Sequence, residues 1–349
     1  MTLKLILSFI LILPILSSCF NQKKLHAFHG KTMGTTYNVK IVADLHESES
    51  IRLAKEIDKL LVNINQKMST YIPDSEISLL NKASANKPVS LSDELYFLIQ
   101  QASSISPLVD EYYDVTIGPL VNLWGFGPGQ RSSNALPSKD LIMKTKLLVG
   151  KNAYRLNSSK KSVTKQYDEV YFDLSSIAKG WGVDQISELL VDKKFEDFMV
   201  EIGGEVRVLG RNKSGAKWKI GVESPLGEGI QKIVPLNNLS MATSGNYRNY
   251  FTSDGKRYSH TINPKTGYPF DNKIASVTVI TKECWRADGL ATALMTQEFS
   301  KIRRLLSLDS ELKDLLDDAA VYVIYRESNQ FKEWSNAKFD QLLANGASK

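Results

Sequence analysis

Two side chains in the segment ADGLATALM (287–295) have the types and the spacing to bind a hard cation. If this segment is helical, Asp288 and Thr292 stand four residues apart and share one face of the helix. A carboxylate and a hydroxyl one turn apart supply oxygen ligands of the kind that Mg²⁺ prefers, and waters complete its shell. The alternative interpretation is that Asp288 only favours the start of the helix and that Thr292 is incidental. The spacing predicts the helix and leaves both interpretations open.

His260 is the only histidine in the large body of the chain, because the other three, His26, His29 and His46, lie near the N-terminus. No neighbouring histidine or cysteine supports a zinc site, and the chain lacks the G-x-S-x-G elbow of serine hydrolases. An imidazole can accept or donate a proton near neutral pH. His260 is therefore either a proton-transfer group or a structural residue in a strand.

Two glycine-containing segments could approach a ligand through their backbone. In FDLSSIAKGWGVDQISELL (172–190) a predicted strand ends near Asp173, and Ser175 and Ser176 can cap the following helix. Backbone N–H groups at such a junction can face an anion, although an ordinary capped helix is an equal interpretation. The segment EIGGEV (201–206) predicts a sharp turn, with a ligand-facing loop as the alternative.

The elements that must position these residues alternate along the chain. Helical and β patterns are interspersed, and several consecutive strands can pair as hairpins. This order predicts the α+β class, with mixed, largely antiparallel sheets flanked by helices in a single catalytic unit, with an arrangement of two lobes as the alternative. The predicted strands are 35–43, 170–174, 198–203, 205–210, 218–224, several within 230–262, 275–281 and 319–326. The predicted helices are 51–69, a short one capped by Ser75, one from Ser92 to about Ser106, 177–194, 287–297 and 300–318.

The N-terminus has the pattern of an export signal. Lys4 precedes an apolar run that is too short for a comfortable membrane span and ends in Leu16-Ser17-Ser18-Cys19, which resembles a bacterial lipoprotein cleavage box. An uncleaved N-terminal anchor helix is the alternative. Acylation of Cys19 by more than one chain would give stable anchoring. We therefore expect a signal peptide at 1–18, a lipidated tether at 19–30, a catalytic domain at 31–349, and a loop or boundary near 131–140.

Composition limits the possible partners. The formal net charge is +6 and the pI is about 9.0, but no long basic block or nucleic-acid motif is present, so no nucleic-acid partner is expected. The chain has two cysteines, so lipidation of Cys19 would leave Cys284 without an intrachain disulfide partner. A hydrophobic content of 42% is enough for a large core.

Eight ordered segments, spread over nearly the whole mature chain, together resemble the ApbE-type FAD:protein FMN transferases. They are KTMGTTYNV (31–39), MSTYIPDSEISLLN (68–81), YDVTIGPLVNLWGFGP (113–128), DLSSIAKGWGVD (173–184), VEIGGEVRVLG (200–210), ATSGNYRNY (242–250), GKRYSHTINPKTGYP (255–269) and ADGLATALM. The resemblance implies an enzyme that cleaves the pyrophosphate of FAD, releases AMP and attaches FMN to a threonine or serine of a target protein, with Mg²⁺ required.

The resemblance also implies roles for particular residues. The metal would be held by Asp288, Thr292 and the backbone carbonyl of Ala178, and Lys179 could reach a phosphate. Trp181 stands where a tyrosine is common in the family, so its role is less defined. The implied FAD-binding residues are Met33, Ser69, Thr70, Tyr71, Asp114, Ser175, Trp181 and Ile262.

A threonine hydroxyl is a poor nucleophile, so the implied reaction calls for a base, and His260 is the candidate. The neighbouring cations Arg248, Lys256 and Arg257 either assist electrostatically or are solvated, and Thr243–Gly245 could shape the same pocket.

The implied partners are proteins of the cell envelope. They include subunits of sodium-translocating NADH:quinone reductase, Rnf-type complexes and other exported FMN-binding domains. The implied location is the periplasmic side of the bacterial envelope with a lipid anchor, for which we expect the inner membrane, although Phe20 and Asn21 do not decide which membrane. Two other functions stay open: an FAD pyrophosphatase that yields FMN and AMP, and a flavin-binding lipoprotein without activity.

Overall fold

The computed structural model describes most of the chain after the N-terminal segment. The described residues are 23–128, 136–225, 227, 229–246, 250–307, 314–328 and 330–347. The predicted signal peptide, Cys19, Arg248 and residues 131–135 of the predicted loop at 131–140 lie outside them. In the part of the chain that is described, no helix combines the length and apolarity needed to cross a bilayer.

A sheet of eight described strands forms the centre of the molecule, in the order β1-β2-β6-β7-β10-β13-β14-β15. Every neighbouring pair in it is antiparallel. The predicted α+β fold with largely antiparallel sheet is therefore confirmed. The strands are β1 (Lys24–Thr32), β2 (Thr35–Ala43), β6 (Phe198–Ile202), β7 (Glu205–Leu209), β10 (Leu239–Gly245), β13 (Ile274–Thr281), β14 (Ala320–Glu327) and β15 (Gln330–Ser335).

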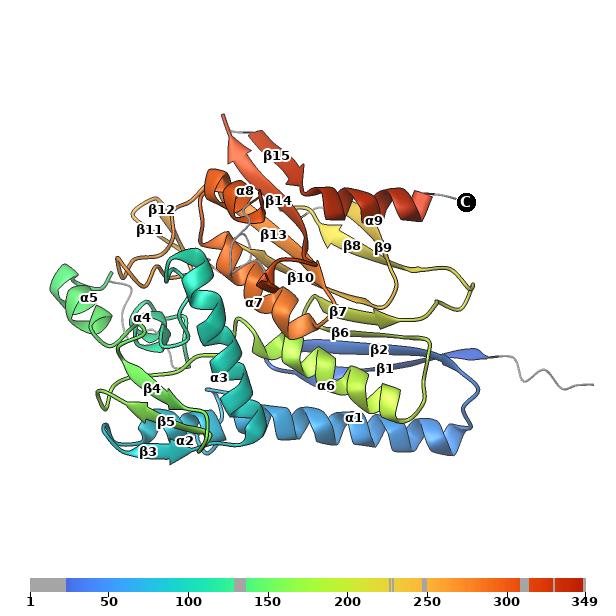
Figure 1. Ribbon diagram of the computed structural model, residues 1–349, viewed down its shortest axis with the longest axis horizontal. Coiled ribbons are helices and arrows are strands. Elements are labelled where there is room, and N and C mark those ends of the chain that lie inside the picture. The colour runs from blue at the N-terminus through green and yellow to red at the C-terminus, as the bar shows by residue number, and fades with distance from the viewer. Residues whose placement is uncertain are drawn as a thin grey trace, which may run out of the picture.

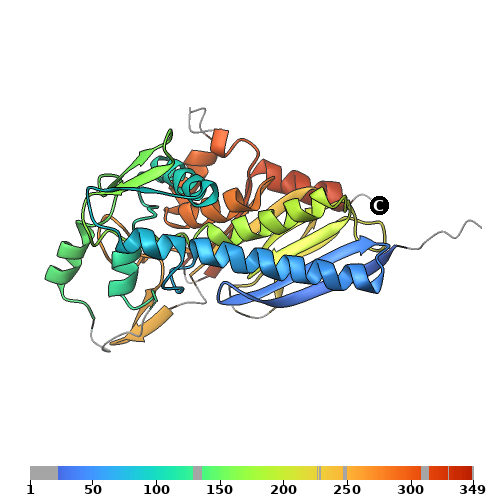
Figure 2. The ribbon, with the colours of Figure 1, turned by 90° about the horizontal axis from the view of Figure 1, so that it is seen from below.

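Different elements cover the two faces of this sheet (Figures 1 and 2). One face packs against long helices, and buried residues from these helices and strands form two adjoining apolar clusters. The other face packs against a separate hairpin and the C-terminal helix through a third cluster. The helices of the first face are α1 (Glu47–Met68), α3 (Asp93–Ile105), α6 (Ala178–Asp192) and α7 (Cys284–Met295). The second face is covered by β8 (Trp218–Glu223), β9 (Ile230–Leu236) and α9 (Ala337–Ala347).

A group of short elements lies beyond α3, at the left end of Figure 1. The buried Lys165 ties this region together, because its Nζ donates to the carbonyl oxygens of Asn81, Asp168 and Val170. The elements here are α2 (Glu76–Lys82), β3 (Pro88–Ser90), α4 (Gly118–Leu123), α5 (Lys139–Lys146), β4 (Tyr154–Asn157) and β5 (Ser162–Lys165). The 3₁₀ helix η1 (Ser106–Val109) continues α3, and α8 (Phe299–Ser307) follows α7.

A two-stranded hairpin, β11 (Tyr250–Ser253) and β12 (Lys256–Ser259), carries His260 just past its second strand. Aromatic rings fix the hairpin to the body of the protein: Tyr258 stacks on Phe251 and on Trp124, with centroids 5.3 and 5.5 Å away. The Trp124 indole N–H also donates to the carbonyl of Gly267 at 2.8 Å. The position of His260 thus depends on a packed aromatic cluster.

Local sequence signals predicted several elements correctly. Ser75 caps α2 by accepting from the Ser78 N–H, and Ser92 caps α3 by accepting from the Leu95 N–H. The strand at 35–43 is β2 with the predicted bounds.

Three predictions are corrected by the structure. Residues 24–30 of the predicted tether belong to β1, which pairs along its whole length with β2. Residues 170–174 belong to no strand, although Val170, Phe172 and Leu174 are buried, and the Phe172 backbone is hydrogen-bonded to the side chain of Asn81. Ser175 and Ser176 do not cap α6, whose N-cap position is Ile177 without a side-chain cap.

Helices α6 and α7 approach each other closely at Gly180. A Cβ atom built on Gly180 would lie 2.4 Å from the carbonyl oxygen of Cys284 and 2.8 Å from the Cα of Trp285. These obstacles are backbone atoms, so a side chain at position 180 would force the two helices apart.

We therefore predict that Gly180→Ala destabilises the protein by about 1–3 kcal/mol through overpacking. Helix propensity alone predicts the opposite sign, a gain of about 1 kcal/mol. Urea unfolding of the mature chain measures the difference, with Asn63→Ala on the exposed side of α1 as the control, for which we expect little change. A Gly180→Ala variant as stable as the parent would show that the helices are not in this contact.

Candidate active site

A cleft of about 360 Å³ opens beside β7, β10, α6, α7 and the end of the β11–β12 hairpin. It brings together many of the residues singled out in the sequence, from segments far apart along the chain. Those that line it are Asp114, Ser175, Lys179, Thr243, Ser244, Gly245, His260, Ile262, Asp288 and Thr292. Asp288, Thr292 and the lone imidazole of the main body therefore share one cleft.

Asp288 and Thr292 lie on the same side of α7, as their spacing predicts. The Asp288 side chain is buried, and its Oδ2 accepts a hydrogen bond of 2.9 Å from the Gly180 N–H at the start of α6. The Thr292 hydroxyl lies 2.9 Å from that of Ser244 on β10. Because α7 begins at Cys284, Asp288 is in its second turn, and the interpretation of Asp288 as a helix-start residue is wrong.

Lys179 and Glu205 complete a charged cluster with Asp288. The Lys179 ammonium lies 3.0 Å from Glu205 Oε1 and 3.7 Å from Asp288 Oδ1. Glu205 follows the glycine pair, whose positive φ angles of 59° and 104° form the β6–β7 turn while both glycines also line the cleft. Glu205 is 4% exposed, and its Oε2 contacts no donor among the described residues.

The electrostatics of this cluster follow from two buried carboxyls sharing one ammonium. Burial raises the pKa of Asp288, and the opposing effect of Lys179 does not cancel it. Burial and the charge of Asp288 raise the pKa of Glu205 to about 8 against the pull of Lys179. Burial disfavours the charged form of Lys179, but the two carboxylates outweigh it and raise the Lys179 pKa. An additional cation in the cleft would relieve this repulsion between carboxylates.

His260 faces the cleft from the hairpin side. Its ring packs edge-on against Phe126 with centroids 6.3 Å apart. The loop that follows is closed by a bridge between Ile262 and Pro269 and by the Asn263 carboxamide, which accepts from the Lys265 and Thr266 N–H groups. This closed loop fixes the backbone on one side of His260.

Three implied FAD-binding residues are in the cleft, where they also have local structural roles. The Asp114 carboxylate accepts from the backbone and the hydroxyl of Thr116 and so stabilises a turn. The Ser175 N–H donates to Asp173, which lines the cleft as well. Ile262 belongs to the aromatic and apolar cluster beneath the hairpin.

The other implied binding residues do not line the cleft. Ser69, Thr70 and Tyr71 follow α1. The Tyr71 side chain is largely exposed, but it is near the cleft residue Asp173. Partial burial, and then the charge of Asp173, raise the Tyr71 pKa. Met33 lies in the β1–β2 turn against Gly182. Trp181 packs against Phe97, with ring centroids 5.4 Å apart, beside a second hollow. Ala178 is the first residue of α6, next to Lys179.

Lys256 and Arg257 lie on β12 outside the cleft lining, and they have other contacts. Lys256 lies 3.9 Å from Asp271, and the Arg257 guanidinium stacks on Tyr250. Their role as solvated strand charges fits these contacts.

Glu205 and Asp184 are the site residues that sequence reasoning missed. Both are buried carboxylates whose charged partners are distant in sequence. The sequence did contain a signal for both residues. Glu205 lies in VEIGGEVRVLG and Asp184 in DLSSIAKGWGVD, and each is an acidic residue beside apolar residues that predict burial.

The oxygen atoms at the end of the cleft suit a hard cation. The described residues contain no cluster of three or more His, Cys, Asp or Glu side chains that could form a closed metal site. Asp288 Oδ1 lies 3.7 Å from the Lys179 ammonium, and Glu205 Oε2 has no hydrogen-bond partner among the described residues. The Asp288 carboxylate and the Thr292 hydroxyl are oxygen donors of the kind that Mg²⁺ binds, and Mg²⁺ keeps several waters in such open sites.

Comparison with solved structures places the fold in the flavin transferase class. The flavin transferase ApbE from Vibrio cholerae has a TM-score of 0.83 and 37% sequence identity, covering 92% of this chain and 99% of that one. The ApbE family matches residues 33–316. Proteins named FAD:protein FMN transferase share 38% identity in Vibrio cholerae and 40% in Haemophilus influenzae, over 95% and 94% of this chain and 97% and 94% of theirs. This chain belongs to the ApbE family.

The raised pKa of Glu205 predicts a pH dependence of stability in the metal-free protein. The folded state keeps the proton up to about pH 8, whereas the unfolded chain releases it near 4.5, so rising pH favours unfolding across this window. We expect the unfolding free energy of the parent, measured in EDTA, to fall relative to that of Glu205→Gln as pH rises from 5 to 8. Parallel curves for the two proteins would show that Glu205 titrates normally.

Proposed function

We infer that this protein is an FAD:protein FMN transferase, an enzyme that attaches the FMN part of FAD to a hydroxyl of an acceptor protein. The single observation that carries the inference is the meeting of Asp288, Thr292 and His260 in one cleft. Membership of a family whose curated relatives have this activity supports it. FAD is therefore the substrate and the acceptor is a protein.

The proposal includes Mg²⁺ as the metal. Asp288, Thr292 and the Ala178 carbonyl would hold it, and the unpartnered oxygen of Glu205 lies in the same cluster. When bound, Mg²⁺ neutralises charge on the pyrophosphate and on the departing AMP. Lys179 would add a second positive charge for a phosphate, and its 3.7 Å distance from Asp288 supports this role.

FAD is a long molecule, and the implied binding residues are not all in the cleft. Asp114, Ser175 and Ile262 line the cleft, and Tyr71 is near the cleft residue Asp173. Met33 lies against Gly182 of α6, and Trp181 packs against Phe97. We propose that the pyrophosphate binds by Lys179 in the cleft and that the rest of the dinucleotide extends beyond it.

His260 acts as the base in this proposal. The acceptor hydroxyl gives its proton to the imidazole while its oxygen bonds to the FMN phosphorus. The bond between that phosphorus and the bridging oxygen breaks, and AMP leaves with the electron pair. The residues around His260 keep the ring at the mouth of the cleft, because Phe126 and the aromatic cluster fix the hairpin.

The proposed acceptors are exported proteins with an FMN-bearing threonine, such as subunits of sodium-translocating NADH:quinone reductase or Rnf-type complexes. The proposed location is the periplasmic side of the bacterial envelope, expected at the inner membrane, with Cys19 lipidated after removal of residues 1–18. The Leu16-Ser17-Ser18-Cys19 pattern supports this location.

We predict that His260→Ala abolishes flavin transfer while FAD binding remains. Loss of a general base lowers the rate by about 10²–10⁴-fold. The measurement is the fluorescent flavin band that an acceptor domain gains after incubation with FAD and Mg²⁺, read on a denaturing gel, together with AMP release.

The matched control is His29→Ala, because His29 is an exposed histidine on β1 away from the cleft. It should label the acceptor at the rate of the parent. Normal labelling by His260→Ala would remove the base assignment. Equal AMP release with and without acceptor would favour the pyrophosphatase.

The lipid anchor gives a separate prediction. The parent should incorporate labelled fatty acid and lose residues 1–18, whereas Cys19→Ala should do neither, because Cys19 carries the acyl chains that supply the anchoring. Metabolic labelling and the mass of the purified protein measure the two changes. A parent that carries no label and keeps residues 1–18 would favour the uncleaved anchor helix.

A further inference from the structure

Helices α6 and α7 satisfy each other's N-terminal backbone groups. The first N–H groups of a helix have no partner within the helix, and most helices use a neighbouring side chain to cap them. Neither α6 nor α7 has such a local side-chain cap. Instead, Asp288 of α7 accepts from the Gly180 N–H of α6, and Asp184 of α6 accepts from the first N–H groups of α7.

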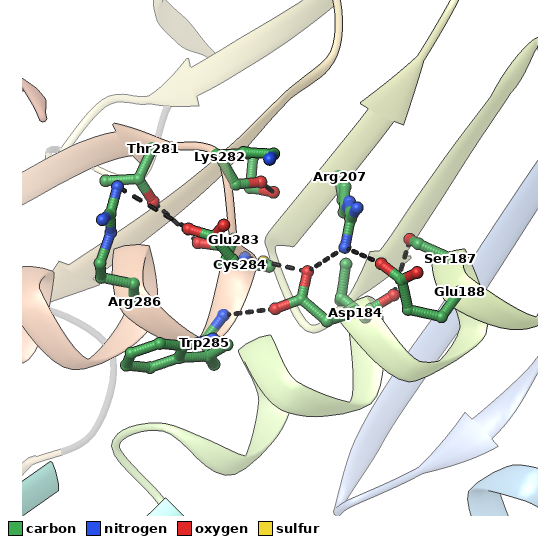
Figure 3. Close-up of polar contacts among 12 residues, drawn as sticks. Asp184, Ser187, Glu188, Arg207, Thr281, Lys282, Glu283, Cys284, Trp285 and Arg286 are labelled. Atoms are coloured by element: carbon green, nitrogen blue, oxygen red, sulfur yellow. Dashed lines mark hydrogen bonds and ion pairs between the residues drawn. The ribbon is translucent and has the colours of Figure 1, made fainter. Parts of the chain in front are cut away.

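Asp184 makes the larger share of these contacts (Figure 3). Its Oδ1 accepts from the Cys284 N–H at 3.0 Å, and its Oδ2 accepts from the Trp285 N–H at 2.9 Å. A carboxylate at this place also opposes the positive end of the helix dipole. One buried side chain thus holds the start of α7 through the backbone N–H groups of two consecutive residues.

Arg207 fixes the Asp184 carboxylate from the sheet. Its NH1 lies 2.8 Å from Asp184 Oδ1 and 2.9 Å from Glu188 Oε1. Arg207 and Glu205 are two residues apart on β7, so both side chains point to the same face of the sheet. This is the face that packs against α6 and α7. The same strand therefore supports the start of α7 through Arg207 and lines the cleft through Glu205.

The position of α7 decides where the proposed metal ligands lie. Asp288 follows the Asp184-bound residues Cys284 and Trp285 by about one turn, and Thr292 follows Asp288 by another. The Gly180 contact fixes the spacing of the two helices at the same point. A shift at the start of α7 would move both ligands together relative to Ala178 and Lys179.

We propose that Asp184 is a positioning residue for the metal site, setting the place of Asp288 and Thr292 by holding the start of α7. This inference rests on the Mg²⁺ site proposed above. It predicts that changes at Asp184 weaken metal binding although Asp184 does not touch the metal. Loss of such an outer contact typically lowers metal affinity about 10–100-fold.

The test measures Mn²⁺ binding to the mature protein, by electron paramagnetic resonance or calorimetry, without FAD or acceptor. In Asp184→Asn the amide keeps one acceptor oxygen but turns an NH₂ group toward an N–H that needs an acceptor. We expect Mn²⁺ affinity to fall about 10–100-fold while circular dichroism shows a folded protein.

Two controls separate positioning from general loss of stability. Glu188→Gln removes the other, largely exposed carboxylate beside Arg207 and should leave Mn²⁺ affinity unchanged. Leu236→Ala opens a cavity in the buried core on the opposite face of the sheet and destabilises the protein by about 2–5 kcal/mol. This variant should also bind Mn²⁺ with the affinity of the parent.

The outcomes are distinguishable. If the parent binds Mn²⁺ and Asp184→Asn binds it equally well, the positioning role is wrong and the metal site stands. If the parent does not bind Mn²⁺, the metal site is wrong and this inference falls with it. If Asp184→Asn does not fold, Arg207→Lys takes its place, since it keeps the charge but not the fork geometry. Weaker Mn²⁺ binding by Arg207→Lys supports the role, and unchanged binding overturns it.

Discussion

The crossed hydrogen bonds between α6 and α7 are the constraint on which the site depends. Each helix gives a buried carboxylate to the N-terminus of the other, Asp184 in one direction and Asp288 in the other. Since buried backbone N–H groups without acceptors are costly, neither helix can shift without breaking the cap of its partner. Gly180 allows the close approach that these bonds require. The geometry of the cleft follows from this pair of helices.

The cleft built on this pair is electrostatically incomplete without a ligand. Two buried carboxyls share the Lys179 ammonium, and one oxygen of Glu205 has no partner among the described residues. Burial raises the pKa of both carboxyls because the low dielectric disfavours two negative charges near one cation. The proposed Mg²⁺ would add the positive charge that these carboxyls lack, and it would also attract the pyrophosphate of FAD. The imidazole of His260 enters from a separate hairpin that aromatic packing fixes.

Local signals in the sequence were enough to predict the α+β class, the caps at Ser75 and Ser92, and the common face of Asp288 and Thr292. Predictions failed where distant partners decide the structure. Residues 24–30 of the predicted tether form part of β1 because β2 pairs with them. The apolar segment at 170–174 is not a strand, and the backbone of its central residue Phe172 bonds to the Asn81 side chain instead of to a neighbouring strand. The role of Asp184 depends on N–H groups 100 residues away, which no local pattern reveals.

Amide hydrogen exchange is the most direct test of the coupling between the two helices. The informative amide is that of Gly180, because this N–H donates to Asp288 and not to Asp184. In Asp184→Asn, a coupled pair predicts faster exchange at Gly180 as well as at Cys284 and Trp285, because release of α7 carries Asp288 away. Faster exchange at Cys284 and Trp285 with unchanged protection at Gly180 would show that the two caps are independent and would contradict the account.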